Sequence, residues 1–240
     1  MNIYPIKTRV LKPPQDNLYE VLDSALPELA EGDIVVVTSK VVSIHQGRCV
    51  LISEAVKEDL VKSEAEKYLP PSCNTAGVAI TIKLNTLIPN AGIDESNADG
   101  YYILWPNNPT AAAREIGQYL KKRDHLKNLG VIISDSHTIP MRWGVIGISI
   151  AFSGFKPLYD YRGSPDIFGR KLKMTTVNIP DALAAAAVLV MGEGNEQTPL
   201  AIIKNVPSIV FSDENFAADL IIPDGDDIYA SLLKVFEKKL

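Results

Sequence analysis

Short, β-branched apolar runs alternate with helix-like segments along the chain, and this alternation most constrains its fold. Gly32-Asp33 leads into Ile34–Thr38, which predicts a turn followed by a fully buried strand. Further strands are expected at 131–133 and 145–152, and helices at 53–69, 110–122, 180–191 and 227–240. Because strands and helices intermix throughout, the sequence predicts the α/β class, with mixed sheets of the α+β kind.

The composition is that of a globular protein with an ordinary core. An apolar fraction of 46% in 240 residues predicts one domain over 1–240, in which the Asn-, Gly- and Pro-rich segment 87–109 is the candidate junction between two subdomains. The net charge of −5 argues against a nucleic-acid partner. No apolar run approaches the roughly 20 residues that cross a bilayer, and the N-terminus does not resemble a signal peptide. Only two cysteines occur, so we expect a cytoplasmic protein with no membrane partner.

Clusters of short polar side chains follow or close several of these segments. They are Asp94-Glu95-Ser96-Asn97 beside Gly92, Ser134-Asp135-Ser136-His137, and Met191-Gly192-Glu193-Gly194-Asn195-Glu196. Side chains this short suit the binding of a compact charged object, such as a metal ion or a phosphate. Acidic clusters at the ends of several elements therefore predict a divalent cation together with a polyphosphate.

Each of these acids also has a purely structural explanation. An aspartate after a buried strand commonly makes a turn or caps a helix, and Glu193 at a helix end is explained by solvation alone. Because Asp94, Asp135 and Glu193 occur together, the functional interpretation has the same weight as the structural one. Arg162 and Arg170 have two interpretations as well, because they could clamp an anion or pair with the neighbouring Asp160 and Asp166. The sequence contains no Walker motif, no Gly-x-Gly-x-x-Gly after a strand and no Gly-x-Ser-x-Gly.

Five blocks of the sequence occur in an order that resembles a known family. The blocks are 32–40 with Gly47-Arg48, 90–97, Asp135-Ser136, 160–172 and 189–194. In these blocks the chain resembles the coenzyme F-420:gamma-glutamyl ligase (CofE-like) family, which attaches glutamate to a deazaflavin precursor with GTP and a divalent metal. The resemblance implies an intertwined homodimer whose fold is neither Rossmann nor P-loop.

The resemblance also implies roles for individual residues. Asp94 and Asp135 would be catalytic and would hold one metal, while Ser136 and Glu193 would serve a second, so that two Mg or Mn ions are expected. The expected GTP contacts are Arg9, Val10, Leu11, Ser39, Lys40, Asn97, Met191, Gly192, Gly194 and Asn195. The implied partners are L-glutamate and a small carboxylate acceptor. Transfer of the terminal phosphoryl group to that carboxylate gives an acyl phosphate, which the amine of glutamate can attack.

Two departures from the family pattern leave alternatives open. Ile44 stands where members often carry a lysine, which leaves the choice between GTP and ATP open. Ile139 replaces an arginine expected after Asp135-Ser136, so a folate acceptor is an alternative to the deazaflavin. Trp105 or Trp143 could stack on its pterin, and a core position explains each equally well. A second alternative is a non-catalytic nucleotide-binding homologue, although survival of all four metal-site residues argues against it.

Overall fold

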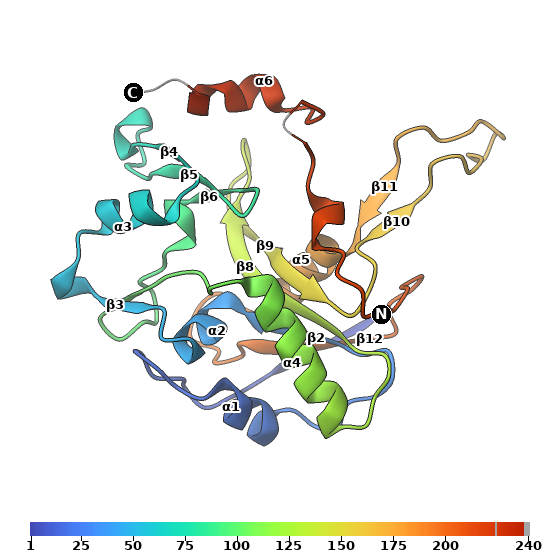
Figure 1. Cartoon of the computed structure of the whole chain (residues 1–240), viewed down its shortest axis with the longest axis horizontal. Helices are drawn as coiled ribbons and strands as arrows, with labels where there is room; N and C mark the ends of the chain where they lie inside the picture. The colour runs from blue at the N-terminus through green and yellow to red at the C-terminus, as the bar shows by residue number, and fades with distance from the viewer. Residues whose placement is uncertain (224, 238–240) are drawn as a thin grey trace.

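A five-stranded mixed sheet forms the centre of the molecule, as seen in the computed structural model, which describes residues 1–223 and 225–237 (Figure 1). The strand order is β1 (Asn2–Ile6), β12 (Leu200–Lys204), β2 (Ile34–Thr38), β8 (Gly130–Thr138) and β9 (Val145–Ser153). Only β2 and β8 run parallel, and the other neighbours are antiparallel. The expected mixed α/β class is confirmed.

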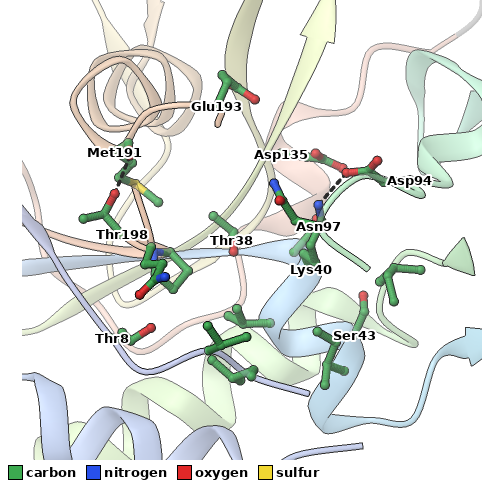
Figure 2. A pocket seen from close by; sticks show the side chains of 18 of the residues that line it. Thr8, Thr38, Lys40, Ser43, Asp94, Asn97, Asp135, Met191, Glu193 and Thr198 are labelled. Carbon is green, nitrogen blue, oxygen red and sulfur yellow. Dashed lines mark hydrogen bonds and ion pairs between the residues drawn. The ribbon is translucent and has the colours of Figure 1, made fainter. Parts of the chain in front are cut away.

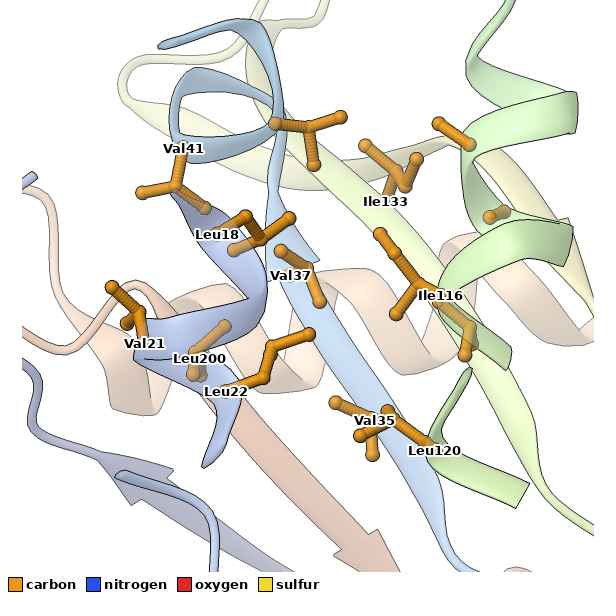
Figure 3. Close-up of a cluster of buried hydrophobic side chains, with 14 of the residues drawn as sticks. Leu18, Val21, Leu22, Val35, Val37, Val41, Ile116, Leu120, Ile133 and Leu200 are labelled. Atoms are coloured by element: carbon orange, nitrogen blue, oxygen red, sulfur yellow. The ribbon is translucent and has the colours of Figure 1, made fainter. Parts of the chain in front are cut away.

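Helices cover both faces of this sheet. They are α1 (Leu18–Ala25) and α4 (Pro109–Arg123) on one face and α5 (Ile179–Met191) on the other. Val35 and Val37 of β2 pack towards α1 and α4, where Leu22 and Ile116 meet them (Figure 3). Ile34 and Val36 point to the α5 side. Residues 34–37 of β2 are all apolar, because a strand that is covered on both faces has no exposed side.

Capping residues set where α4 and α5 begin and where α5 ends. Asn108 accepts a hydrogen bond from Ala111 N at the start of α4, whose last turn carries three basic residues that suit the negative end of the helix dipole. Asn178 caps α5 in the same way, and α5 ends at Gly192, whose φ of +82° places it in the left-handed region. The helices expected at 110–122 and 180–191 are therefore confirmed.

The remaining elements form smaller sheets and a projecting arm. They are α2 (Ser39–His45), β3 (Cys49–Leu51), η1 (Ile52–Glu54), α3 (Lys57–Glu64), β4 (Lys67–Leu69), η2 (Pro71–Cys73), β5 (Ile80–Lys83), β6 (Thr86–Pro89), η3 (Asn90–Gly92), β7 (Tyr101–Ile103), β10 (Leu158–Asp160), β11 (Thr176–Asn178), η4 (Ala217–Leu220), α6 (Ala230–Leu233) and η5 (Lys234–Glu237). β4, β5 and β6 make a three-stranded sheet, while β10 and β11 form a hairpin that projects from the body (Figure 1).

Three of the expected elements are wrong in extent. The helix expected at 53–69 ends at Glu64, after which Lys67–Leu69 pairs with β5 as a strand. The strand expected at 131–133 continues to Thr138 along β9. The closing helix is limited to α6 and η5, and residues 238–240 of the expected span lie outside the described residues.

Within 1–223 and 225–237, none of the helices is long and apolar enough to cross a membrane. The single-domain organisation with a junction at 87–109 stays a prediction.

Candidate active site

A cavity of about 550 Å³ opens where β2 ends, beside the middle of β8. β2 ends at Thr38, which pairs with Ser134 of the parallel strand β8, while β8 continues to Thr138. Ser39 and Asp135 follow this pair directly and line the cavity. The edge beyond the carboxyl ends of parallel strands is where ligands bind in many α/β proteins.

The structure brings every candidate site residue to this one cavity. Figure 2 labels Lys40, Asp94, Asn97, Asp135, Met191 and Glu193 among them. The residues expected to bind metal, Asp94, Asp135, Ser136 and Glu193, all line it, as do the expected nucleotide contacts Arg9, Val10, Leu11, Ser39, Lys40, Asn97, Met191, Gly192, Gly194 and Asn195. They come from segments at both ends and in the middle of the chain. Their placement is thus observed, while their individual roles stay predictions.

Asp135 reaches the cavity because β8 does not end where its apolar run ends. The register with β9 shifts between Ile133 and Ser134, and such a bulge re-aims the side chains that follow it. Asp135 Oδ1 accepts a hydrogen bond from Ser136 N at 2.8 Å, and Oδ2 accepts one from Trp105 Nε1. Burial raises the pKa of Asp135 to about 6, and the charge of Asp94 adds to this against the hydrogen bonds from Trp105 and Ser136.

Asp94 is held ionised by its neighbours. Lys40 Nζ lies 2.7 Å from Asp94 Oδ2, and Ser96 N donates to Oδ1 at 2.8 Å. Burial alone would raise the pKa of Asp94, but the charge and hydrogen bond of Lys40, together with Ser96, outweigh it and bring the pKa below its ordinary value. Lys40 also donates to Ser96 O at 2.7 Å, so one ammonium group ties α2 to the loop after β6.

The loop after α5 supplies the third carboxylate. Burial raises the pKa of Glu193, and the charges of Asp94 and Glu196 act in the same direction, while a hydrogen bond with Ser136 opposes them. Asn97 Nδ2 donates to Gly194 O at 2.9 Å and so fastens this loop to the Asp94 segment. Asp94 consequently lies within electrostatic range of both Asp135 and Glu193. In Figure 2, Glu193 stands apart from Asp94 and Asp135.

The side chains of this site are of the chemical type that binds a divalent cation, but they do not form a complete coordination site by themselves. Carboxylate and hydroxyl oxygens are the donors that Mg²⁺ and Mn²⁺ take. The pKa values of Asp135 and Glu193 are raised mainly by burial, and the charge of Asp94 adds to both shifts. In the part of the chain that the structure describes, no three His, Cys, Asp or Glu side chains are grouped closely enough to hold an ion. Mg²⁺ usually binds through one or two carboxylates plus phosphate oxygens and water. The donor set therefore suits an ion that arrives with a phosphate ligand.

The structure shows what surrounds four further residues that the sequence analysis named. Arg9 has its guanidinium engaged by both carboxylate oxygens of Asp16, each at 2.7 Å. Ile44 lines the cavity one helical turn beyond Lys40, so these two side chains share a face of α2. Trp143 is 105% exposed and Trp105 is 1% exposed, so the core interpretation holds for Trp105 alone.

The arginines of the β10–β11 hairpin do not line the cavity. Arg162 Nη2 pairs with Asp160 Oδ2 at 2.7 Å, which confirms the structural interpretation of Arg162. Arg170 donates its backbone N–H to Asp166 Oδ1 at 2.8 Å. Both aspartates thus stabilise turns of the hairpin.

Two buried serines of the cavity have no role among the predictions from the sequence. Ser43 Oγ and Ser134 Oγ are buried without a hydrogen-bond partner among the described residues, and both serines line the cavity. Buried hydroxyls are normally satisfied, so these two mark places for a ligand or water. Ser134 belongs to a polar cluster that the sequence singled out, whereas Ser43 and Trp105 occur in helical or apolar contexts that have no such mark.

The sequence matches the F420-0:gamma-glutamyl ligase family model over residues 5–205, a span that contains every residue of the candidate site. The chain belongs to the F420-0:gamma-glutamyl ligase family. Coenzyme F420:L-glutamate ligase of Methanopyrus kandleri is 34% identical over 222 residues, which cover 86% of this chain and 87% of that protein. The ligase of the same name from Methanococcus maripaludis strain C7 is 33% identical over 245 residues, covering 95% and 97%. That of Halorubrum lacusprofundi is 33% identical over 212 residues, covering 79% and 81%. The resemblance found in the sequence blocks is thereby confirmed.

Proposed function

We propose that this member of the F420-0:gamma-glutamyl ligase family joins L-glutamate to the carboxylate of a coenzyme F420-0-type acceptor, using GTP and a divalent metal through an acyl phosphate. The observation that carries the proposal is the convergence of Asp94, Asp135, Ser136, Glu193 and Lys40 on one cavity. A carboxylate does not react with an amine near neutral pH because its oxygen is a poor leaving group. Phosphorylation supplies the leaving group, and this step demands charge neutralisation more than any other protein contribution.

The side chains divide this task. Asp94 and Asp135 would hold one Mg or Mn ion, and Ser136 and Glu193 a second, and these ions would neutralise phosphate charge. Lys40 is the cation already present at the site, 2.7 Å from Asp94, and its ammonium group can turn to a phosphate oxygen. Asn97 fixes the loop that begins at Met191, so that this loop can enclose the triphosphate and limit access of water.

The size and lining of the cavity suit a nucleotide with a small second substrate. Its volume of about 550 Å³ lies within the usual range of small-molecule sites. Apolar side chains of Leu11, Val41 and Ile44 line it alongside the charged groups, and such a mixture accommodates a base as well as phosphates. GTP is the expected nucleotide, and the assay described below compares the activity with GTP and with ATP.

We also propose a homodimer, formed through the β10–β11 hairpin. Phe168 is 83% exposed at its tip, and Ile167 and Met174 are exposed beside it. Apolar side chains gathered on an arm that projects from the body are typical of a contact with a second copy of the chain. The hairpin carries few core contacts of its own, so a partner surface explains its composition.

The relatives described above carry the names of coenzyme F420 and L-glutamate, which supports the F420-0-type acceptor over a folate. Trp105, one of the two candidates for stacking on a pterin, is buried with its N–H bonded to Asp135. The non-catalytic alternative has no observation in its favour, because all four proposed metal ligands line the cavity.

The test is an assay of the purified protein with F420-0, L-glutamate, Mn²⁺ and either GTP or ATP. We expect phosphate release that depends on glutamate, and a product heavier by one glutamyl residue in mass spectrometry. Asp94→Asn and Asp135→Asn should abolish both signals while the circular dichroism spectrum stays unchanged, because each removes one charge from the cation site. Turnover retained in either variant, or wild-type release that is indifferent to glutamate, would contradict the proposal.

A further inference from the structure

Trp105 connects the smaller three-stranded sheet to the candidate site. Its side chain packs with Ile88 and Ile148 and is 1% exposed. At the cavity side, Nε1 donates a hydrogen bond to Asp135 Oδ2. An indole N–H is a donor only, so this contact fixes which carboxylate oxygen faces the ring.

A partly buried group of charges holds Trp105 in place. Arg48 Nε donates to Trp105 O at 3.1 Å, and Lys83 Nζ lies 5.7 Å from the centre of the indole ring. Glu64 Oε2 accepts from both cations, at 2.7 Å from Arg48 Nη2 and 2.6 Å from Lys83 Nζ. The backbone and the ring face of Trp105 are thus oriented by one network.

Gly92 leaves the space that the indole needs. A Cβ atom at this position would lie 2.2 Å from Trp105 Nε1, and its φ of +72° is itself unfavourable for residues other than glycine. The backbone before Asp94 therefore passes directly beside the N–H that contacts Asp135. This arrangement places the indole N–H beside both the backbone that leads to Asp94 and the carboxylate of Asp135.

Both oxygens of Asp135 have a protein donor, and the side chain of Ser39 also hydrogen-bonds to this carboxylate. Ser136 N occupies one position on Oδ1, and Trp105 Nε1 occupies one on Oδ2. A carboxylate fixed at both oxygens presents its remaining lone pairs in a single orientation. Partners of this kind behind a metal ligand normally contribute 10- to 100-fold in metal affinity or activity.

We propose that Trp105 is a positioning residue, whose N–H sets Asp135 in the orientation that binds a divalent cation in the cavity. The inference rests on the proposed function, because it takes Asp135 as a cation ligand. If Trp105 only filled the core, phenylalanine would lower stability through the cavity that it leaves but would not change the affinity of the folded protein for the cation. The N–H is the one feature that separates the two explanations.

The first experiment compares Trp105→Phe with Trp143→Phe, the same change at a fully exposed position. Free Mn²⁺ is counted by electron paramagnetic resonance in the presence of saturating GDP, with GDP alone as the blank. We expect Trp105→Phe to bind Mn²⁺ about 10- to 100-fold more weakly, and Trp143→Phe to bind as wild type does. The KM for glutamate should change little in either variant. Equal Mn²⁺ affinity in the two variants would overturn the inference.

A second measurement leaves the buried position untouched. The chain has two tryptophans, so in Trp143→Phe the emission reports on Trp105 alone. Adding Mn²⁺ with GDP should quench this emission, and the Mn²⁺ concentration at half-quenching should equal the one at half-saturation in the electron paramagnetic resonance measurement. Adding Asp135→Asn to the Trp143→Phe protein should remove the quenching. Mn²⁺ binding that leaves the emission unchanged would overturn the inference and leave the proposed function standing. If neither wild type nor Trp143→Phe binds Mn²⁺, the metal dependence of the proposed function fails together with it.

Discussion

Asp135 occupies a position where its charge is unfavourable for folding and necessary for the proposed chemistry. Its pKa of about 6 lies above the ordinary value of 3.8, and burial is the main cause. Between these two values the folded protein binds a proton that the unfolded chain has lost. The free energy of unfolding therefore decreases as the pH rises from about 4 to about 6, and it stays lower at higher pH.

Asp135→Asn should consequently stabilise the cation-free protein at pH 8. The difference between 3.8 and about 6 sets an upper limit of about 3 kcal/mol, which is reduced because the Asn oxygen accepts from only one of the two N–H donors. The gain should shrink as the pH falls below about 5, where Asp135 is protonated in wild type. Urea unfolding at pH 8 and pH 5 measures both values.

Asp94→Asn is the matched control, since the pKa of Asp94 is lowered instead of raised. The Lys40 pair makes the charge of Asp94 favourable, so its removal should give no stabilisation at pH 8. Equal stabilisation by the two substitutions would show that the two carboxylates do not differ in the way described.

At the same scale, the sequence indicated the acids of the site but not the groups that orient them. Asp94, Asp135 and Glu193 belong to polar clusters whose short side chains are conspicuous after apolar segments. Trp105 lies in an apolar context, and its N–H contact with Asp135 spans 30 residues of sequence. Contacts between distant segments leave no local pattern, so a donor of this kind is found only in the folded structure.

Helix α5 packs closely against strand β9 at Gly147. A Cβ at Gly147 of β9 would lie 2.5 Å from Ala184 O and 2.6 Å from Val188 Cγ2 of α5. Gly147 has no left-handed φ to preserve, so the constraint on it is purely steric. Because Glu193 follows the end of α5, this contact also sets the depth at which its loop enters the site.

Gly147→Ala should push α5 away from the sheet. We expect a loss of about 1–3 kcal/mol in the free energy of unfolding, as for other overpacked cores, together with weaker nucleotide binding. Urea unfolding and equilibrium binding of GDP measure the two effects. Gly225→Ala is the control, because among the described residues other than its chain neighbours no atom lies within 4 Å of a Cβ there. Wild-type stability in Gly147→Ala would mean that the packing relaxes without cost.

The elements that the sequence predicted correctly are those fixed by local patterns. β2 is apolar throughout, and α4 and α5 have a capping Asn before a Pro and helix-forming residues. The expected helix at 53–69 was wrong beyond Glu64 because 67–69 pairs with β5, a partner that periodicity does not reveal. β8 was predicted too short for the same reason, since its polar half is held by β9.

At the scale of the whole molecule, the proposed homodimer depends on the β10–β11 hairpin. Phe168→Asp places a charge on the exposed apolar tip and should convert the dimer to a monomer. Light scattering after gel filtration gives the molar mass directly, against 26.2 kDa for one chain. Val56→Asp, at an exposed apolar position outside the hairpin, should leave the mass unchanged. A wild-type mass of one chain, or a Phe168→Asp protein that keeps the mass of two, would contradict this interface.

The order of strands in the main sheet has a consequence for synthesis on the ribosome. β12, with residues Leu200–Lys204, lies between β1 and β2, which are made first. A nascent chain that has emerged only as far as β8 can pair β2 with β8, but β1 has no neighbour in this sheet until β12 arrives. The strand that joins β1 to β2 is therefore made only after β8, and a partial chain that stops before Leu200 lacks the connection between these two early strands.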